Sequence, residues 1–359
     1  MNSERAAPMQ FTHESRAQRV TFAAHHACAA VAEELAAIGA TKVMLIASAR
    51  ERSLADAITQ QAPVVHHHEE VVMHVPLEVA ERAREAAVAA GADALVSVGG
   101  GSAVGLAKAV ALTIGLPIVA VPTTYAGSEA THVWGITEGT TKTTGVDARV
   151  LPRAVVYDAA LLATMPGPMA VASGLNALAH GVDSMCGPNA DPIDRALAQE
   201  GIRGLAAGLP LVASDSGSIE GIEQTLYGAY LAAVSFASAG SGMHHKICHV
   251  LGGMFNLPHA QTHAVVLPHV LAFNAPHAPD ADDRVATALD SKTAVVGLAH
   301  LYASLDAPRA LRDYGMPQDG IADAAARILE VIPTNNPAPV TEESLTALLD
   351  AAWAGDQSA

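Results

Sequence analysis

Short runs of apolar and β-branched residues alternate with Ala-rich amphipathic stretches between Arg19 and about Asp158. Such alternation is typical of parallel strands connected by helices. The pattern predicts strands at residues 42–47, 94–98, 118–121 and 154–157, and helices at residues 29–38, 53–60, 76–90 and 104–112. Gly39 and Gly91 directly follow two of these helices and are expected to end them. The first part of the chain is therefore predicted to be an α/β domain with a parallel sheet.

The strand pattern almost disappears after Asp158, where long Ala-, Leu- and Gly-rich helical stretches follow at residues 168–212 and 219–250. A chain of 359 residues also exceeds the size at which a single hydrophobic core keeps growing. We therefore expect two domains, an α/β domain over residues 1–158 and an all-helical domain over residues 159–359.

Charge and hydropathy exclude two classes of partner. The chain has 20 Lys and Arg against 36 Asp and Glu, a formal net charge of -16, so nucleic acid would be repelled over most of the surface. Its apolar stretches are interrupted before they reach the roughly 20 residues that a membrane-spanning helix requires. Neither nucleic acid nor a membrane is an expected partner.

Cysteine usage and the N-terminus indicate the compartment. Cys28, Cys186 and Cys248 are an odd number without the spacing of a disulfide framework. The charged first 20 residues lack the apolar core of a signal peptide. We expect a protein of the reducing cytoplasm.

A glycine-rich turn follows the strand predicted at residues 94–98 and precedes the helix predicted at residues 104–112. The turn consists of Gly99, Gly100, Gly101 and Ser102. This order places backbone N–H groups and a helix N-terminus where a phosphate can bind, with no Cβ to block it. Glycines and hydroxyls recur after the next predicted strand, at Thr123, Thr124, Gly127 and Ser128. Because carboxyl ends of parallel strands bind ligands in doubly wound folds, these segments predict a dinucleotide site.

Histidines gather in the predicted helical domain. Asn176 and His180 are four residues apart and share a helix face, His245 and His249 repeat this spacing, and His259 follows. Each could be a core histidine, but several buried imidazoles would all need hydrogen-bond partners. We favour an active site. A separate run at residues 66–68 could bind metal, but beside Glu69 and Glu70 we interpret it as a solvated loop.

These motifs together resemble the iron-containing alcohol dehydrogenase family over nearly the whole chain. The resemblance implies the dehydroquinate synthase-like fold, with a parallel-sheet dinucleotide-binding domain and an all-α domain, and a homodimer. Within the family, the markers are similar to those of the maleylacetate reductase branch. They lie at residues 134–138, 142–145, 150–153, 244–249, 256–259, 262–264 and 336–337.

The family's metal-ligand positions correspond to Asn176, His180, His245 and His259. Metal-dependent members have Asp at the first of these positions, and also where this chain has Gly105. Three neutral imidazoles and an amide lack the carboxylate that offsets a cation's charge, so metal affinity should fall. We expect the cluster to persist and no metal to be required.

The branch implies that NADH or NADPH reduces the carbon–carbon double bond of maleylacetate, and of substituted maleylacetates, to 3-oxoadipate in aromatic-compound degradation. The implied catalytic residues are His249, His245, His180, His259 and Lys142. Those implied for the dicarboxylate substrate are Asn176, Lys246 and His263, with Arg153 a further cation for which we favour a surface role. The cofactor would be bound by Ser48, Gly99, Gly100, Gly101, Ser102, Thr123, Thr124 and Ser128. Ser48 lacks the charge that rejects a 2′-phosphate.

Departures from the family leave alternatives open. Residues 22–25 read Phe-Ala-Ala-His where the family has Phe-Gly-x-Gly, Ala338 replaces a common Arg, and Gln261 replaces a common Glu. A metal-dependent alcohol dehydrogenase, a dehydroquinate synthase-like lyase, and a binding protein without activity are the other hypotheses. A metal-binding carboxylate is not evident for the lyase, and the retained histidines argue against the binding protein.

Overall fold

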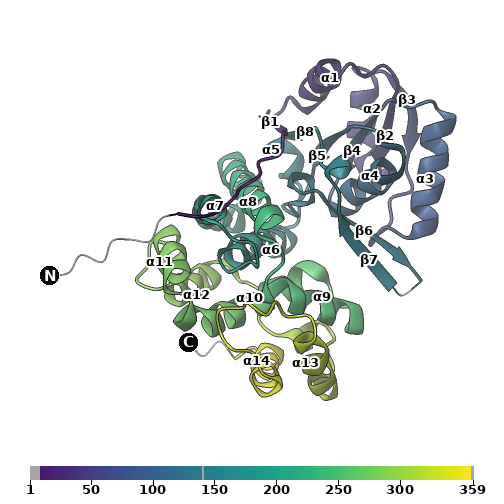
Figure 1. The fold of residues 1–359 in the computed structure, drawn as a ribbon. Helices are drawn as coiled ribbons and strands as arrows, with labels where there is room; N and C mark the ends of the chain where they lie inside the picture. The colour runs from purple at the N-terminus through teal and green to yellow at the C-terminus, as the bar shows by residue number, and fades with distance from the viewer. Residues whose placement is uncertain (1–8, 140, 357–359) are drawn as a thin grey trace.

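The computed structural model of the chain describes residues 9–139 and 141–356, and at Thr141 and Lys142 it describes the backbone without the side chain. In Figure 1 the chain forms two parts, a sheet covered by helices and a group of helices beside it.

The first part contains a six-stranded sheet among the described residues, with all neighbouring strands parallel. In spatial order the strands are β1 (Arg19–Phe22), β8 (Ala154–Tyr157), β5 (Ile118–Pro122), β4 (Ala94–Gly99), β2 (Val43–Ala47) and β3 (Val64–His68). The predicted fold class, a parallel-sheet α/β part followed by helices, is confirmed.

Helices cover both faces of this sheet because successive strand residues point to opposite sides. Val43 and Leu45 of β2 pack with α1 (Ala27–Ala37) and α2 (Arg52–Thr59). Met44 and Ile46 pack on the other face with α3 (Leu77–Ala89) and α4 (Gly101–Ile114). Gly39 and Gly91, which follow α1 and α3, have φ values of 72° and 61°, as expected of residues that end helices.

The prediction of a solvated loop at residues 66–68 is wrong. These histidines form the end of edge strand β3, with His66, His67 and His68 opposite Met44, Leu45 and Ile46. His68 is buried, and a ring nitrogen of His67 lies 3.0 Å from the carbonyl oxygen of Ala47. Pairing with the buried strand β2 has overridden the polar composition of the segment.

A two-stranded antiparallel hairpin was not predicted. It consists of β6 (Val133–Glu138) and β7 (Thr141–Val146), and in Figure 1 it extends from the sheet domain toward α9. The amide of Thr137 donates to the carbonyl oxygen of Val75, which holds the hairpin beside the start of α3. The hairpin thus packs against the sheet domain beside α3 and α4.

The rest of the chain is helical. The helices are α5 (Ala159–Leu162), α6 (Gly167–Met185), α7 (Pro192–Ser214), α8 (Ile219–Ala239), α9 (Met243–Phe255), α10 (His259–Asn274), α11 (Pro279–Ala288), α12 (Ala294–Leu305), α13 (Ile321–Leu329) and α14 (Glu342–Ala354). The predicted stretch 168–212 is interrupted between α6 and α7, and the stretch 219–250 is interrupted before α9, where Gly240 has a φ of 79°. The division into domains at residue 158 remains our interpretation.

Helices α7 and α8 pack with their backbones close together. An added Cβ at Gly228 would lie 2.5 Å from the Leu205 amide nitrogen and 2.6 Å from the Gly201 carbonyl oxygen. Glycines on both helices therefore permit the contact. Among the described residues, no helix combines the length and apolar character needed to cross a membrane.

Candidate active site

The glycine-rich turn lies between β4 and α4, as predicted. Gly99 has a φ of 139°, and Gly100 precedes the first turn of α4. An added Cβ at Gly100 would lie 2.9 Å from the Cγ2 atom of Thr124, so a larger residue would displace the neighbouring loop. The turn therefore presents the N-terminus of α4 at the carboxyl edge of the sheet, the arrangement that suits a phosphate.

The neighbouring strand ends bring the other predicted cofactor residues to this edge. Ser48 follows β2, and Thr123 and Thr124 follow β5, on the two sides of β4. The amide of Thr123 donates to the carbonyl oxygen of Gly99 over 3.1 Å, and its hydroxyl lies 3.4 Å from Oε1 of Glu51. Their assignment to the cofactor remains a prediction.

The loop with Gly127 and Ser128 connects the sheet edge to the helical part. Gly127 has a φ of 72°, and an added Cβ would lie 2.8 Å from Cβ of Ala233 and 3.3 Å from Nδ1 and Cε1 of His180. The amide of Tyr125 also donates to the Ser173 hydroxyl of α6 over 3.1 Å. The predicted dinucleotide edge is therefore adjacent to the first histidine of the cluster.

A buried lysine that sequence reasoning missed holds this loop. Nζ of Lys108, on α4, donates to the carbonyl oxygens of Ser128, Thr131 and Val133 at 2.6–2.8 Å. Burial lowers the pKa of Lys108 to about 7, and the charge of Glu129 opposes the decrease. No motif marks Lys108 in the sequence. The one indication that it is buried is its position within a strongly apolar helix.

The histidine cluster forms where α6, α8, α9 and α10 meet. The rings of His180 and His245 are stacked with centroids 5.0 Å apart, and Phe236 lies 4.1 Å from His245. His263 lies 4.7 Å from His245 and 4.4 Å from His259. The structure thus brings together the histidines that the sequence predicted.

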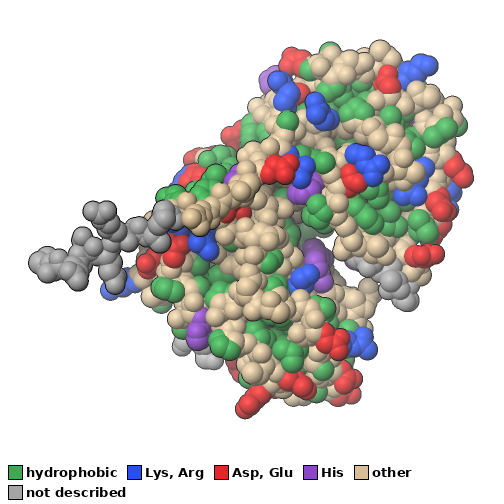
Figure 2. Space-filling model, viewed as in Figure 1, with side chains coloured by type: hydrophobic (Ala, Val, Ile, Leu, Met, Phe, Trp, Pro, Cys, Tyr) green, Lys and Arg blue, Asp and Glu red, His purple; other side chains and the backbone are tan. Residues whose placement is uncertain are grey.

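His249 extends the cluster toward solvent. Its ring centroid lies 6.1 Å from that of His245, one helical turn earlier on α9. The side chains of His249 and His259 are exposed, while those of His180, His245 and His263 are buried. Figure 2 shows histidines in a hollow between the two parts of the molecule. The exposed members can therefore meet a ligand directly.

Asp183 orients His245 and was missed in the sequence. Its carboxylate accepts from the Gly242 amide at 2.9 Å, the His244 amide at 3.1 Å and Nδ1 of His245 at 2.8 Å. With Nδ1 occupied in this way, Nε2 of His245 is the nitrogen available to the site. Asp183 lies seven residues after Asn176, about two turns along the same helix, but an isolated Asp in a helix has no distinctive pattern.

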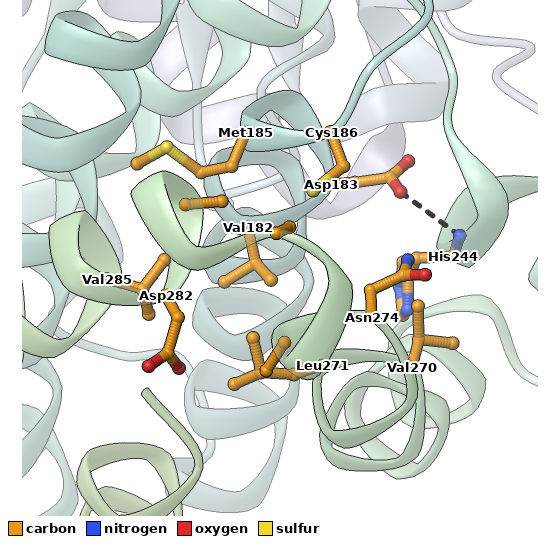
Figure 3. A pocket seen from close by; sticks show the side chains of 13 residues that line it. Val182, Asp183, Met185, Cys186, His244, Val270, Leu271, Asn274, Asp282 and Val285 are labelled. Atoms are coloured by element: carbon orange, nitrogen blue, oxygen red, sulfur yellow. Dashed lines mark hydrogen bonds between the residues drawn. The ribbon is translucent and has the colours of Figure 1, made fainter. Parts of the chain in front are cut away.

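A cavity of about 20 Å³ is lined by Asp183, His244 and Asn274, among other residues. Figure 3 shows these side chains. Nε2 of His244 lies 2.9 Å from Nδ1 of His263, so these rings form a buried pair. Asn274 exchanges two side-chain hydrogen bonds with Asn336, at 3.2 and 2.8 Å. The Asn336 marker thus attaches the C-terminal segment to α10.

The buried rings are neutral near pH 7. Burial lowers the pKa of His180 to about 4, against the opposing effect of Asp183. Burial also holds the pKa values of His244, His245 and His263 well below their ordinary range, and nearby imidazoles contribute. Neutral imidazoles can accept a cation or donate a hydrogen bond.

The donor atoms fit a divalent metal ion. Oδ1 of Asn176, Nδ1 of His180 and Nε2 of His245 are buried and have no hydrogen-bond partner among the described residues. The nitrogens of His244, His245 and His263 are also close, within 4.8 Å of one another, but two of these rings already bond to each other. Asn176, His180 and His245 thus have donor atoms that could hold a metal, and with His259 they remain the predicted set. The carboxylate of Asp183 does not belong to this set, but it is hydrogen-bonded to His245, which does.

One predicted cation lies away from the site, and the side chain of another is not described. Arg153 directly precedes β8 and is exposed, which places it at the amino edge of the sheet, opposite the glycine-rich turn. The backbone of Lys142 lies in β7 opposite Thr137, while its side chain is outside the part of the chain that the structure describes. Lys246 is half-buried on α9, between His245 and His249.

The turn after β1 has His25 where the family has glycine, and its backbone is nevertheless left-handed. His25 has a φ of 64°, and its amide donates to Oδ1 of Asp158 over 2.8 Å, while the Ala27 amide donates to Oδ2 of Asp158. His25 is the residue at which the family's second glycine was expected, so the left-handed conformation persists without the glycine.

Comparison with known proteins gives consistent matches along the chain. Residues 17–159 match the family described as iron-containing alcohol dehydrogenase, and residues 170–353 match the C-terminal part of the same family. A maleylacetate reductase from Sphingobium indicum is 43% identical over 348 residues, covering 97% of this chain and 98% of the relative.

Two solved structures are also similar. An iron-containing alcohol dehydrogenase from Corynebacterium glutamicum has a TM-score of 0.96 and 57% identity, with 98% of each chain covered. A maleylacetate reductase from Agrobacterium tumefaciens has a TM-score of 0.93 and 35% identity, covering 98% of this chain and 100% of the other.

Proposed function

Because the chain belongs to the iron-containing alcohol dehydrogenase family, we propose that it uses NADH or NADPH to reduce the carbon–carbon double bond of maleylacetate to 3-oxoadipate. The observation that carries this proposal is the similarity to maleylacetate reductases over nearly the whole chain, which includes the helices of the histidine cluster. Substituted maleylacetates are expected substrates as well.

The reaction divides into a hydride transfer and a proton transfer. Maleylacetate is a dianion in which the double bond is conjugated to a ketone. Hydride from the nicotinamide adds to the carbon β to the ketone, the π electrons move toward the ketone oxygen, and an enolate forms. An acid then protonates the adjacent carbon, which gives 3-oxoadipate and the oxidised cofactor. The protein must therefore stabilise one developing oxyanion and supply one proton.

His249 is our candidate for the group that hydrogen-bonds the enolate oxygen. It is exposed beside the buried cluster, on the same helix as His245, so a ligand bound against the cluster can reach it. His245 and His180 are neutral, and Asp183 fixes the orientation of the first. A neutral imidazole that donates a hydrogen bond suits an enolate, whose charge is delocalised.

Substrate binding requires local cations, since the net charge of -16 opposes a dianion. Lys246 and Lys142 are our candidates for the carboxylates, with Asn176 and His263 as further polar contacts. Ser48 carries no charge at the adenosine side, which supports use of both NADH and NADPH.

Metal dependence is the finer part of the proposal. A divalent ion held by Asn176, His180, His245 and His259 would act as a Lewis acid toward the developing oxyanion. We propose that reduction does not require it, because the amide of Asn176 contributes no charge. The family is described as iron-containing, and Asp183 supplies a carboxylate one hydrogen bond away from the donor set; both oppose the proposal.

Assays of NADH and NADPH oxidation with enzymatically generated maleylacetate test the function. Formation of 3-oxoadipate is expected, with activity that persists after extensive chelation. Turnover of simple aldehydes without turnover of maleylacetate would instead support a metal-dependent alcohol dehydrogenase, the description carried by the similar Corynebacterium structure. A homodimer is also proposed from the family resemblance, and light scattering coupled to gel filtration would measure the mass.

A further inference from the structure

A second cluster of metal-binding side chains lies away from the active site. Nδ1 of His13 lies 2.9 Å from Oδ2 of Asp191 and 3.6 Å from Oδ1 of Asp194. One ligand atom from each residue lies within 4.8 Å of the other two. His13 belongs to the N-terminal segment, residues 9–18, which in Figure 1 passes α7 on its way to β1.

The start of α7 orients both carboxylates. Oδ1 of Asp191 accepts from the amides of Ile193 and Asp194, and Oδ2 of Asp194 accepts from the amide of Asp191. This reciprocal arrangement is a capping box, and it uses one oxygen of each carboxylate. The other two oxygens are the ones directed at His13.

One of these oxygens has no partner. The Asp194 side chain is fully buried, and its Oδ1 atom has no hydrogen bond among the described residues. Burial raises the pKa of Asp194, an effect that the Ser238 hydroxyl and the Asp191 amide oppose. A buried carboxylate oxygen without a donor is costly unless a cation or proton satisfies it.

Among the lysine and arginine side chains that the structure describes, none forms an ion pair with Asp191 or Asp194. Arg195 is next in sequence to Asp194, but it donates to the Met185 carbonyl oxygen and lies 3.6 Å from Asp280. A neutral His13 can donate a single proton from Nδ1, and it does so 2.9 Å from Asp191. Apart from the backbone amides of the capping box and the Ser238 hydroxyl, His13 is therefore the donor that these two adjacent carboxylates share.

We propose that His13, Asp191 and Asp194 form a binding site for a divalent transition-metal ion such as Zn²⁺, separate from the histidine cluster. One imidazole and two carboxylates are ligands that such ions accept, and a dication would neutralise both carboxylates. Nδ1 of His13 binds in its deprotonated form, so metal binding displaces the proton held between His13 and Asp191. The site goes beyond the proposed reductase function and does not depend on it.

The position of the site gives the ion a structural role. The segment that carries His13 continues to Gln18, whose side chain donates to the carbonyl oxygens of Glu129 and Pro152 in the sheet domain. An ion bound to His13 would attach the same segment to α7 of the helical part. With the metal bound, the N-terminal segment would contact the sheet domain through Gln18 and the helical part through His13.

Metal counting on the full-length protein tests this proposal. Chelated wild type, His13→Gln and His245→Ala are dialysed against Zn²⁺, and bound zinc is measured by mass spectrometry. We expect His13→Gln to bind one equivalent less than wild type, and His245→Ala to retain that equivalent. His300→Gln, which alters an exposed histidine on α12, is the matched control and should bind as wild type does.

Proteolysis provides a second measurement that does not depend on stoichiometry at the active site. Zn²⁺ should slow tryptic cleavage after Arg16 about tenfold in wild type and in His245→Ala, and should not slow it in His13→Gln. Circular dichroism verifies that each variant is folded. Equal zinc content in wild type and His13→Gln, or loss of all zinc in His245→Ala, would overturn the site and leave the reductase proposal intact.

Discussion

His249 and Lys142 are expected to contribute to different parts of the reaction. A group that bonds the developing enolate oxygen acts mainly in the transition state, whereas a contact with a substrate carboxylate has similar strength before and after hydride transfer. We therefore expect His249→Ala to lower kcat about 100-fold or more. Lys142→Ala should mainly raise KM for maleylacetate, provided that binding is near equilibrium.

Steady-state kinetics of the two variants measure this difference, after fluorescence titration has shown that both still bind NADH. Near-normal kcat in His249→Ala together with a large loss in His245→Ala or His180→Ala would mean that the roles within the cluster are assigned to the wrong residues. If all three variants are active, the mechanism itself is wrong.

Asn176 decides the charge of the potential metal site. Asn176→Asp adds a carboxylate to a donor set that otherwise contains three imidazoles, so zinc or iron affinity should rise at least tenfold. Isothermal titration against wild type measures the change. If chelation abolishes wild-type activity and metal restores it, the Asn176 amide is sufficient for metal binding, and a carboxylate at this position is not required.

His25 has a left-handed backbone although it is not glycine. The φ of 64° costs a residue with a Cβ about 1 kcal/mol relative to glycine. His25→Gly should therefore leave stability unchanged or raise it by up to about 1 kcal/mol, since the bonds to Asp158 come from the backbone. Urea denaturation measures the difference. A clear loss of stability would show that the imidazole itself is required.

Lys108 connects three elements, α4, the 3-10 turn Ser128–Ala130 and β6. Its pKa falls from 10.5 to about 7 on folding, so between these pH values the unfolded chain binds more protons than the folded one. Stability contributed by Lys108 therefore rises with pH in this window and stays constant below it. The advantage of wild type over Lys108→Met should grow between pH 7 and pH 9.5.

Denaturant titrations of both proteins at the two pH values give this difference, and other titrating groups cancel to a first approximation because they occur in both. A difference that shrinks as pH rises would mean that the Lys108 ammonium is favoured, not penalised, in the folded protein.

The close contact between α7 and α8 requires glycine at position 228 of α8, whereas Gly252 of α9 has no neighbour that a side chain would meet. Gly228→Ala places a Cβ against the backbone of the opposite helix, which cannot move aside cheaply, so we expect a loss of about 1–3 kcal/mol. Gly252→Ala on α9 meets nothing within 4 Å and should be neutral or stabilising by up to about 1 kcal/mol. Thermal unfolding of the two variants compares them directly.

At the scale of the whole molecule, sequence patterns predicted the buried strands well and the edge strands poorly. β2, β4 and β5 are almost entirely apolar and covered on both faces, a pattern that the sequence shows directly. β1 and β3 are the partly exposed edge strands, and their formation depends on pairing with one neighbouring strand. Local composition cannot contain that information.

The candidate site was predicted to a similar extent. Glycine turns and regularly spaced histidines form patterns, and the structure brings them together at Gly127 and His180. Asp183 and Lys108 were missed because single charged residues in helices resemble any solvated residue until the fold shows that they are buried. Their partners are backbone groups of distant segments.

The pairing of β1 with β8 also has a consequence for synthesis on the ribosome. The first strand emerges early, yet its one neighbour in the sheet is the last strand of that sheet to be translated. Until residues 154–157 leave the exit tunnel, β5 has an unpaired apolar edge, and the segment that carries His13 must wait longer still for Asp191 and Asp194. The nascent sheet is therefore open to wrong partners during this interval, and chaperones that bind apolar strands would be expected to engage the chain before the helical part appears.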